Sequence, residues 1–443
     1  MNKSVISFLL LLPAFLFSQV KEKELAANFI QFLFANRVSE AYQLFDSTVK
    51  SKITEEQLGT IMPGIEKQFG KFISGIDTLV NPSVDDSTRR ADGENELTTF
   101  DFGCKFENGS LSFKIVVNNK QEISGFWITP KTDKVEYRIP EYVNIAKFKK
   151  VDVEFGLPEW RLQGTLTIPR RIEKPPVVIL VHGSGPNDRD ETIGPNKPFK
   201  DLAWGLASKG IAVLRYDKRT KLHGSKMKPD DINIQAEVID DVLEAVNFLK
   251  ARDDVDKSKI IVLGHSLGAM VAPMIASQSQ SISGIIMMAA PARKLEDLVL
   301  EQMEYIYSLK EAISEDERNF LTDLQLKVDS LKNKTLSPST PIIGIPASYF
   351  YDLAKYDQVK TAKGLKLPIL ILQGERDYQV TMEDFINWTK ELSQHKNVML
   401  KSYPKLNHLF MTGKGKAKPE EYKLPNSVDI GVIKDIVDWV REI

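Results

Sequence analysis

The sequence predicts an α/β protein with a mostly parallel, eight-stranded sheet covered by helices on both faces, preceded by a small α+β domain. From about residue 150 onward, short apolar runs alternate with segments of helical period, which is typical of strands joined by crossover helices. Several of these runs are apolar at nearly every position, as expected for strands buried on both faces. Before residue 130, helical spacing comes first and strand-like alternation follows, which indicates a separate α+β domain.

The large sheet is expected to open with an antiparallel pair of strands at 151–155 and 162–168. Parallel strands are then expected at 177–181, 212–215, 260–263, 284–288, 368–372 and 398–403. The segments between them have helical period, and the expected helices cover 199–208, 234–251, 266–277, 382–392 and 428–441.

One turn in this region has the pattern of a catalytic nucleophile. Gly264-His265-Ser266-Leu267-Gly268 lies between an apolar strand-like run and a helix-like segment. A serine in a G-x-S-x-G turn between strand and helix presents its hydroxyl above the sheet, and the glycines permit close approach of the two backbones. The alternative is a tight serine turn that only connects the two elements. The context favours Ser266 as a nucleophile.

A serine nucleophile in this setting needs an acid and then a histidine later in the chain. Of the five histidines, His408 fits, because it lies in a loop after the last expected strand. His182 and His265 belong to other motifs, His223 precedes the serine, and His395 lies in a polar surface turn.

The acid is expected just after the strand at 368–372. Asp377 is the first candidate because it lies deeper in the loop, where Val380 can pack beside it. Glu375 is the alternative. The acid would orient His408 and stabilise its protonated form.

A tetrahedral intermediate also needs hydrogen-bond donors for its oxyanion. The backbone N–H of Leu267, directly after the nucleophile, is one expected donor. The strand at 177–181 ends in His182-Gly183-Ser184-Gly185, and the backbone N–H of Ser184 is the other. His182 is expected to brace this loop rather than act as a base.

These motifs resemble those of the α/β-hydrolase superfamily over residues 147–443. The segment from His182 to Glu191 and the motif Leu214-Arg215-Tyr216-Asp217-Lys218-Arg219 are similar to the bacterial serine aminopeptidase-like and carboxylesterase branch. The resemblance implies a Ser-His-Asp hydrolase that needs no cofactor and no metal. It leaves the substrate open, because this fold hosts many activities.

Residues 291–365 are expected to form a helical cap inserted before the acid strand, above Ser266. Segments 296–307 and 314–331 have helical period. The aromatic and methionine side chains in the insertion are candidates for an apolar wall around the acyl group, although each is more readily explained by packing: Met303, Tyr305, Tyr307, Tyr349, Phe350 and Tyr351. A capped pocket favours a small substrate.

The expected N-terminal domain covers residues 20–130, and 131–146 form a linker that contains Pro140. Helical spacing between Glu24 and Phe45 and a cap-like Thr54 are followed by strand patterns at 96–102, 111–117 and 122–128. The pattern resembles a nuclear-transport-factor-2-like domain of unknown function that precedes bacterial hydrolases. The sequence identifies no partner for it.

Residues 1–19 have the pattern of a cleaved secretory signal peptide, with Lys3 before an apolar run from Val5 to Phe17. An uncleaved anchor is the alternative. We therefore expect export to the periplasm or the medium, with no membrane span left after cleavage. The single cysteine, Cys104, permits no internal disulfide, so cysteine usage does not bear on this expectation. A net charge of −1 without a basic run argues against nucleic acid as a partner.

The function expected from the sequence is hydrolysis of small carboxylic esters through an acyl-enzyme on Ser266. An aminopeptidase or amidase with the same three residues is the first alternative. It would need a carboxylate for a free α-amino group, for which Asp188, Asp190 and Glu191 are candidates more readily explained as solvated loop residues. A binding or scaffold protein that acts through its N-terminal domain is the alternative of another class, and the complete set of catalytic residue types argues against it.

Overall fold

The computed structural model describes residues 12–79, 97–130, 137–228 and 232–443. It divides into two compact units, Met1–Val135 and Glu136–Ile443, which are described separately below. Residues 1–11 of the expected signal segment lie outside the described residues, and 12–19 belong to helix α1 (Leu12–Phe34). Among the described helices, none is both long enough and apolar enough to cross a bilayer.

The first unit consists of helices followed by an antiparallel sheet with the strand order β1-β2-β3-β4. Helices and strands have these bounds: α2 (Val38–Gln43), α3 (Ser47–Lys50), α4 (Glu55–Gly59), α5 (Ile61–Phe69), β1 (Phe72–Leu79), β2 (Leu97–Phe106), β3 (Gly109–Asn118) and β4 (Ile123–Pro130). The Thr54 side chain accepts the Gln57 N–H and caps α4. The core is rich in phenylalanine, and the rings of Phe29 and Phe45 lie 5.1 Å apart.

The second unit is built on an eight-stranded sheet with the order β14-β13-β10-β9-β7-β8-β6-β5. Its strands are β5 (Phe148–Phe155), β6 (Leu162–Pro169), β7 (Val177–Val181), β8 (Ala212–Tyr216), β9 (Ile260–His265), β10 (Ile282–Met288), β13 (Ile369–Gly374) and β14 (Val398–Tyr403). The β5–β6 and β6–β8 pairs are antiparallel and the other pairs are parallel. The predicted mostly parallel, eight-stranded sheet is therefore confirmed.

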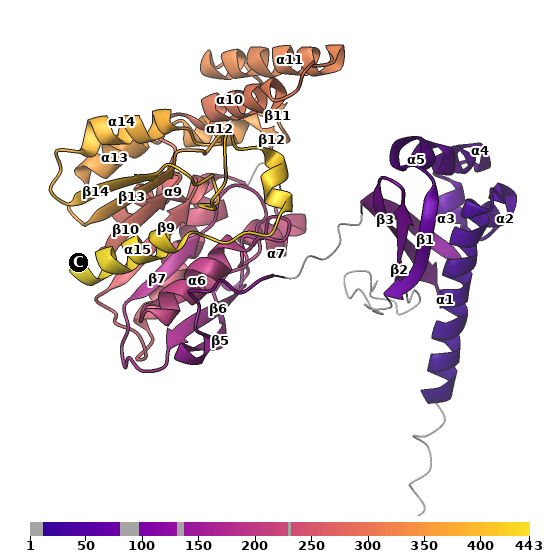
Figure 1. Ribbon diagram of the computed structural model, residues 1–443, viewed down its shortest axis with the longest axis horizontal. Helices are drawn as coiled ribbons and strands as arrows, with labels where there is room; N and C mark the ends of the chain where they lie inside the picture. Colours follow the sequence, from indigo (N-terminus) through magenta and orange to yellow (C-terminus); the bar gives the residue numbers. More distant parts are fainter. Residues whose placement is uncertain (1–11, 80–96, 131–136, 229–231) are drawn as a thin grey trace, which may run out of the picture. The chain divides into compact units, whose positions relative to one another are not determined.

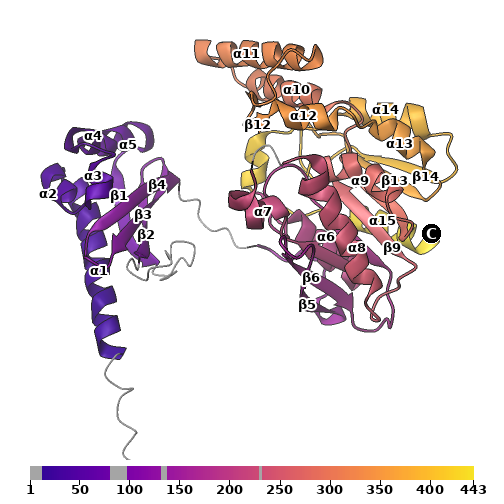
Figure 2. The same cartoon turned by 180° about the vertical axis from the view of Figure 1, so that it is seen from behind.

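Helices cover both faces of this sheet, as Figures 1 and 2 show. Along β7, Val177 and Ile179 face one apolar core, whereas Val178 and Leu180 face the other, which is the alternation of a strand buried on both sides. The first core is covered by α8 (Asp240–Lys250), α9 (Leu267–Ser277) and α14 (Met382–Leu392), and the second by α6 (Pro198–Ser208) and α15 (Ile430–Glu442). A π-helical turn at Gln235–Ile239 precedes α8.

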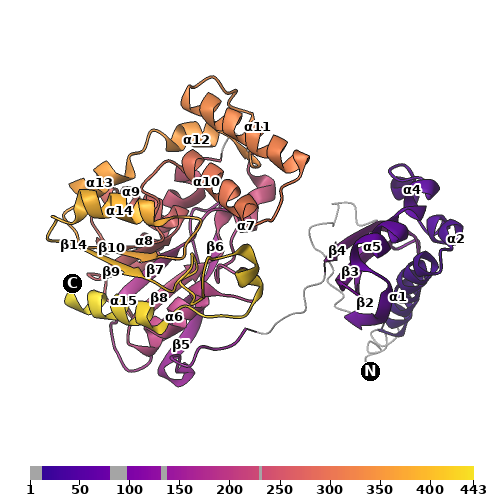
Figure 3. The same cartoon turned by 45° about the horizontal axis from the view of Figure 1, so that its top comes forward.

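The insertion between β10 and β13 projects from one end of the unit (Figures 1 and 3). It contains α10 (Leu295–Ser308), α11 (Glu315–Lys332), β11 (Pro341–Ile342), β12 (Ile345–Pro346), α12 (Ala347–Leu353) and α13 (Gln358–Gly364). The elements from α10 to α12 are called the cap. Phe350 and Met303 pack within its apolar core, and α13 packs against α9 of the main body.

Residues 137–146, in the second part of the expected linker, pack on the second unit. The Tyr137 hydroxyl donates to Asp201 Oδ1 at 2.7 Å, and the Tyr142 hydroxyl donates to the Val428 carbonyl at 2.9 Å. The folded second unit therefore begins well before β5.

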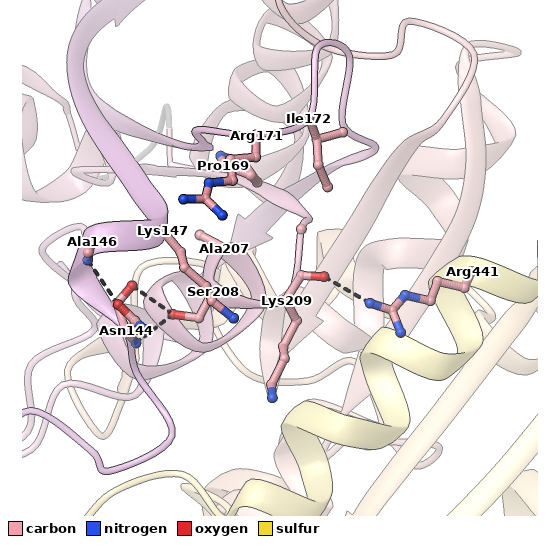
Figure 4. A pocket seen from close by; sticks show the side chains of 11 residues that line it. Asn144, Ala146, Lys147, Pro169, Arg171, Ile172, Ala207, Ser208, Lys209 and Arg441 are labelled. Atoms are coloured by element: carbon pink, nitrogen blue, oxygen red, sulfur yellow. Dashed lines mark hydrogen bonds between the residues drawn. The ribbon is translucent and has the colours of Figure 1, made fainter.

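An open cavity of about 620 Å³ lies at the carboxyl end of α6 and holds none of the predicted catalytic residues. Its lining is Asn144, Ala146, Lys147, Pro169, Arg171, Ile172, Ala207, Ser208, Lys209, Gly210 and Arg441. In Figure 4 the basic side chains point in different directions, and Arg441 donates to the Lys209 carbonyl at 3.0 Å.

Candidate active site

Ser266 lies between the end of β9 and the start of α9 in a strained backbone conformation. Its φ of 53° and ψ of −118° lie in a region that residues with a side chain rarely adopt. The Ser266 N–H donates to the Met288 carbonyl of the neighbouring strand at 2.9 Å, and its carbonyl accepts the Met270 N–H. The turn is thus held by both β10 and α9.

The two glycines of the turn are sterically required. A Cβ atom at Gly264 would lie 2.2 Å from the Gly268 carbonyl oxygen. A Cβ atom at Gly268 would lie 2.3 Å from the Val181 carbonyl oxygen at the end of β7. Strand, helix and neighbouring strand therefore meet backbone to backbone at this point, which exposes the serine above the sheet edge.

Asp377 and His408 form a buried pair at the same edge of the sheet. Asp377 Oδ2 lies 2.7 Å from His408 Nδ1, and their side chains are 0% and 6% exposed. The other carboxylate oxygen accepts the backbone N–H groups of Gln379 and Val380 at 2.8 and 3.0 Å. Because β13 and β14 are parallel neighbours, the loops that follow them meet at their carboxyl ends.

Glu375, the alternative acid, has a different partner. Its carboxylate is exposed and accepts a hydrogen bond from Ser402 Oγ at 2.8 Å. Asp377 is therefore the acid that the loop brings to His408.

The two expected oxyanion donors lie on the turns around Ser266. A Cβ atom at Gly183 would lie 3.3 Å from Ser266 Cβ, so the turn after β7 is adjacent to the serine. Within the described ranges, the backbone N–H groups of Ser184 and Leu267 donate to no protein acceptor. Both remain free to bind a substrate oxygen.

A buried contact between Glu191 and His265, which the sequence analysis did not predict, connects three of these segments. Glu191 Oε2 lies 3.0 Å from His265 Nδ1, and Glu191 Oε1 accepts the Gly183 N–H at 2.8 Å. His265 Nε2 lies 2.9 Å from the His408 carbonyl oxygen.

Glu191 and His265 shift each other's pKa in opposite directions. Burial alone lowers the pKa of His265, but the Glu191 carboxylate and the His408 carbonyl outweigh burial and raise it. Burial raises the pKa of Glu191, and the nearby His265 outweighs this and lowers it.

A second buried network reaches the same turn. Lys218 Nζ donates to the Gly183 carbonyl at 2.9 Å and to Glu237 Oε1 at 2.5 Å. The hydroxyl of Tyr349, in α12, donates to Glu237 Oε2 at 2.6 Å. Glu191 and Lys218 belong to the two motifs quoted above for the family resemblance, but no local pattern indicated which groups they bind.

Comparison with known proteins adds to this geometry. Residues 175–414 match the family model described as serine aminopeptidase, S33. The chain belongs to the S33 serine aminopeptidase family. It is therefore a hydrolase, and the predicted α/β-hydrolase membership is confirmed. Residues 26–126 match a second model, DUF3887, which is described as a protein of unknown function.

Several known proteins are similar to this S33 hydrolase. Esterase EstD of Thermotoga maritima is 40% identical over 416 residues, which cover 93% of each chain. Est1E from Butyrivibrio proteoclasticus is 16% identical and aligns over 66% of this chain and 99% of its own, with a TM-score of 0.45. The Pyrococcus furiosus esterase Pf2001 is 18% identical over 71% of this chain and 99% of its own, with a TM-score of 0.43.

The three carboxylates considered for amine binding in this S33 hydrolase all have internal partners. Asp188 accepts the Thr192 hydroxyl and backbone N–H at 2.8 and 3.0 Å. Asp190 pairs with Arg215 and with Lys197. Glu191 accepts the Gly183 N–H and lies beside His265. In the part of the chain that the structure describes, no group of three His, Cys, Asp or Glu side chains could hold a metal ion.

Proposed function

We propose that this S33 hydrolase cleaves small carboxylic esters through an acyl-enzyme on Ser266, with His408 as general base and Asp377 as the orienting acid. The observation that carries the proposal is the buried Asp377–His408 pair at the sheet edge where the strained Ser266 turn also ends. The 40% identity to a protein named as an esterase, over nearly the whole chain, supports the ester as substrate.

In the proposed reaction His408 Nε2 takes the proton of Ser266 Oγ, which attacks the ester carbonyl carbon. The oxyanion of the tetrahedral intermediate is bound by the N–H groups of Ser184 and Leu267. His408 then gives its proton to the leaving alcohol, and water hydrolyses the acyl-enzyme by the same steps. Asp377 accepts the Nδ1 proton of His408 in a hydrogen bond, which fixes the tautomer and stabilises the imidazolium. These steps use protein groups and water alone.

A peptidase with the same residues is the competing proposal, and the name of the family favours it. An aminopeptidase needs a carboxylate for the α-amino group of its substrate. Asp188, Asp190 and Glu191 already bind protein groups, so their engagement supports the ester.

The cap supports a small substrate. Its helix α10 is joined to the loop that carries Asp377: Tyr305 stacks on Tyr378 with ring centroids 5.0 Å apart, and the Gln302 side chain donates to the Gln379 carbonyl at 2.9 Å. A helix attached directly beside the acid limits the room for a polymer or a long acyl chain.

The test is a substrate panel of p-nitrophenyl esters of graded acyl length, a long-chain triglyceride and aminoacyl p-nitroanilides. We expect short esters to be cleaved fastest. Ser266→Ala and His408→Ala should each lower kcat on the order of 10⁴-fold or more, because the three residues act as a unit. Asp377→Asn should also cost on the order of 10⁴-fold, whereas Glu375→Gln, its matched control in the same loop, should stay near wild type.

Three results would reject the proposal. Near-normal turnover by Ser266→Ala, or failure of a fluorophosphonate to label Ser266, would remove the serine from the chemistry. Faster cleavage of anilides that carry a free α-amino group would replace the esterase with the aminopeptidase.

We also propose that the protein is exported after removal of residues 1–19, on the basis of the apolar run from Val5 to Phe17. Sequencing the N-terminus of the mature protein tests this. A chain that retains Met1 would contradict cleavage.

A further inference from the structure

The direction of the proposed oxyanion donor is set by the peptide group between Gly183 and Ser184. A trans peptide is planar, so its C=O and N–H point in opposite directions. Whatever holds the Gly183 carbonyl therefore decides where the Ser184 N–H points. Because Gly183 has no Cβ, its own backbone preference restrains this peptide very little.

Two side chains donate to that carbonyl: the Asn187 amide at 3.3 Å and, at a shorter distance, Lys218. Its ammonium group donates to the Gly183 oxygen at 2.9 Å from a side chain that is 2% exposed. A buried ammonium is stable only when it is paired, and Glu237 supplies the carboxylate at 2.5 Å. The strong donor therefore points at one peptide oxygen of the turn beside Ser266.

The preceding peptide group has a buried partner of its own. The Gly183 N–H donates to Glu191 Oε1 at 2.8 Å, and Glu191 is itself fixed by His265. Both peptide groups of Gly183 thus have a charged, buried partner, whereas the Ser184 N–H, like that of Gly185, donates to no acceptor within the described residues.

We propose that Lys218 is a positioning residue that keeps the Ser184 N–H directed at the oxyanion, and that Glu237 and Tyr349 connect this function to the cap. The inference rests on the proposed function, since it takes Ser184 as an oxyanion donor. Lys218 touches no reacting atom and acts through the Gly183 peptide.

The connection to the cap follows from a continuous series of contacts. Tyr349 lies in α12 and is 4% exposed, and its hydroxyl donates to the Glu237 oxygen that Lys218 leaves free. Glu237 lies in the π-helical turn before α8, a type of distortion that is frequent at functional sites. If α12 moved, Glu237 would lose its hydrogen bond from Tyr349 and would hold Lys218 less firmly. The Ser184 N–H would then be oriented less precisely.

A positioning role predicts a loss that appears in the transition state and not in substrate binding. The variants are Lys218→Met and the double variant Lys218→Met/Glu237→Gln, which leaves no unpaired buried charge. With p-nitrophenyl butyrate we expect kcat to fall roughly 10²-fold to 10³-fold, the usual cost of losing one oxyanion donor. KM should stay within about threefold of wild type, because bound substrate in its ground state needs the donor little.

A trifluoromethyl ketone provides the second readout, because its adduct with Ser266 places an oxyanion in the hole. Its inhibition constant should rise in proportion to the loss of kcat/KM across the variants. A role in stability alone would not produce this proportion. Tyr349→Phe, which removes only the hydroxyl, should lower kcat about twofold to tenfold, in line with one hydrogen bond.

The matched control is Arg219→Met/Asp241→Asn. Arg219 follows Lys218 directly and forms an equally buried ion pair with Asp241, 3% and 0% exposed, but does not bind Gly183. This control should lose stability and keep kcat. The inference is overturned if the control loses as much kcat as the Lys218 variants, or if the ketone binds all variants equally.

Two further outcomes separate this inference from the proposed function. Wild-type protein that fluorophosphonate does not label contradicts the proposed function. Labelled wild type together with fully active Lys218 variants rejects only the positioning role. If the Lys218 variants fail to fold, Tyr349→Phe decides, and unchanged kcat in that variant rejects the connection from the cap to Ser184.

Discussion

Two buried histidines at the ends of neighbouring strands have opposite pKa shifts. Burial lowers the pKa of His182 to about 4, and its Nδ1 has no hydrogen-bond partner within the described residues. His182 Nε2 lies 3.1 Å from the Asp188 carbonyl, as a neutral ring protonated on Nε2 requires. The pKa of His265, which lies beside the carboxylate of Glu191, is raised. Burial therefore dominates at His182, whereas the neighbouring carboxylate outweighs burial at His265.

The neutral state of His182 predicts a loss of stability in acid. Because its pKa falls from 6.5 in the unfolded chain to about 4 in the folded one, the unfolded state binds more protons between these values. The contribution of His182 to the free energy of unfolding therefore has its full value above about pH 7 and is lost as the pH falls toward 4. His182→Gln, which keeps a donor for the Asp188 carbonyl, should not show this loss.

Urea unfolding of wild type and His182→Gln at pH 7.5, 6 and 4.5 measures the effect. Tryptophan fluorescence is a suitable signal, because four of the five tryptophans lie in the second unit. The stability advantage of wild type should shrink by roughly 1 to 3 kcal/mol across this range. Comparison with the variant removes opposing contributions such as Asp201, whose pKa burial raises to about 7. If the difference in free energy of unfolding between wild type and His182→Gln stayed the same at all three pH values, a neutral His182 would be contradicted.

Residue roles differ in how far the sequence could predict them. The motif around Ser266 and the loop of His408 are local patterns, so both candidates could be identified from short segments. The choice between Asp377 and Glu375 needed the loop geometry, which turns one toward His408 and the other toward Ser402. The Lys218–Gly183 and Glu191–His265 contacts join distant segments, and no periodicity encodes such partners.

At the level of elements, the strands that the sequence predicted are those with continuous apolar runs or clear alternation. The strand β1 was not predicted. It contains Gly75 and Asp77, residues that are rare in strands, and its register against β2 shifts twice, so the regular alternation that would reveal it is missing. The helices and strands around Ser266 follow the predicted order because each one buries a recognisable apolar face.

The contact between β7, β9 and α9 predicts a severe effect of Gly268→Ala. The new methyl group would lie 2.3 Å from the Val181 carbonyl oxygen, a backbone atom that can move only with its strand. We expect a loss of about 1 to 3 kcal/mol in stability, together with a large loss of kcat because the Ser266 turn must shift. Gly364→Ala is the control, since nothing lies within 4 Å of its Cβ position. Thermal unfolding and ester turnover measure both effects, and normal kcat in Gly268→Ala would contradict the need for this close approach.

At the scale of the whole molecule, the chain consists of two units with separate cores. The apolar cluster of the first unit is formed by residues between Leu25 and Ile128, and the two clusters against the large sheet are formed by residues from Tyr137 onward. All residues with a proposed role in the reaction lie in the second unit, from Gly183 to His408. The first unit supplies none of the chemistry in the proposed mechanism.

This division predicts that a fragment of residues 136–443 keeps the chemical step. The fragment should start at Glu136 because Tyr137 and Tyr142 pack on the second unit and bind Asp201 and the Val428 carbonyl. A fragment that begins at Lys147 lacks these bonds and should be less stable by about 1 to 3 kcal/mol, because it leaves the buried Asp201 carboxyl with fewer partners. Circular dichroism measures folding of both fragments, and fluorophosphonate labelling measures acylation of Ser266. A folded 136–443 fragment that is not labelled, beside full-length protein that is, would show that the first unit contributes to the active site.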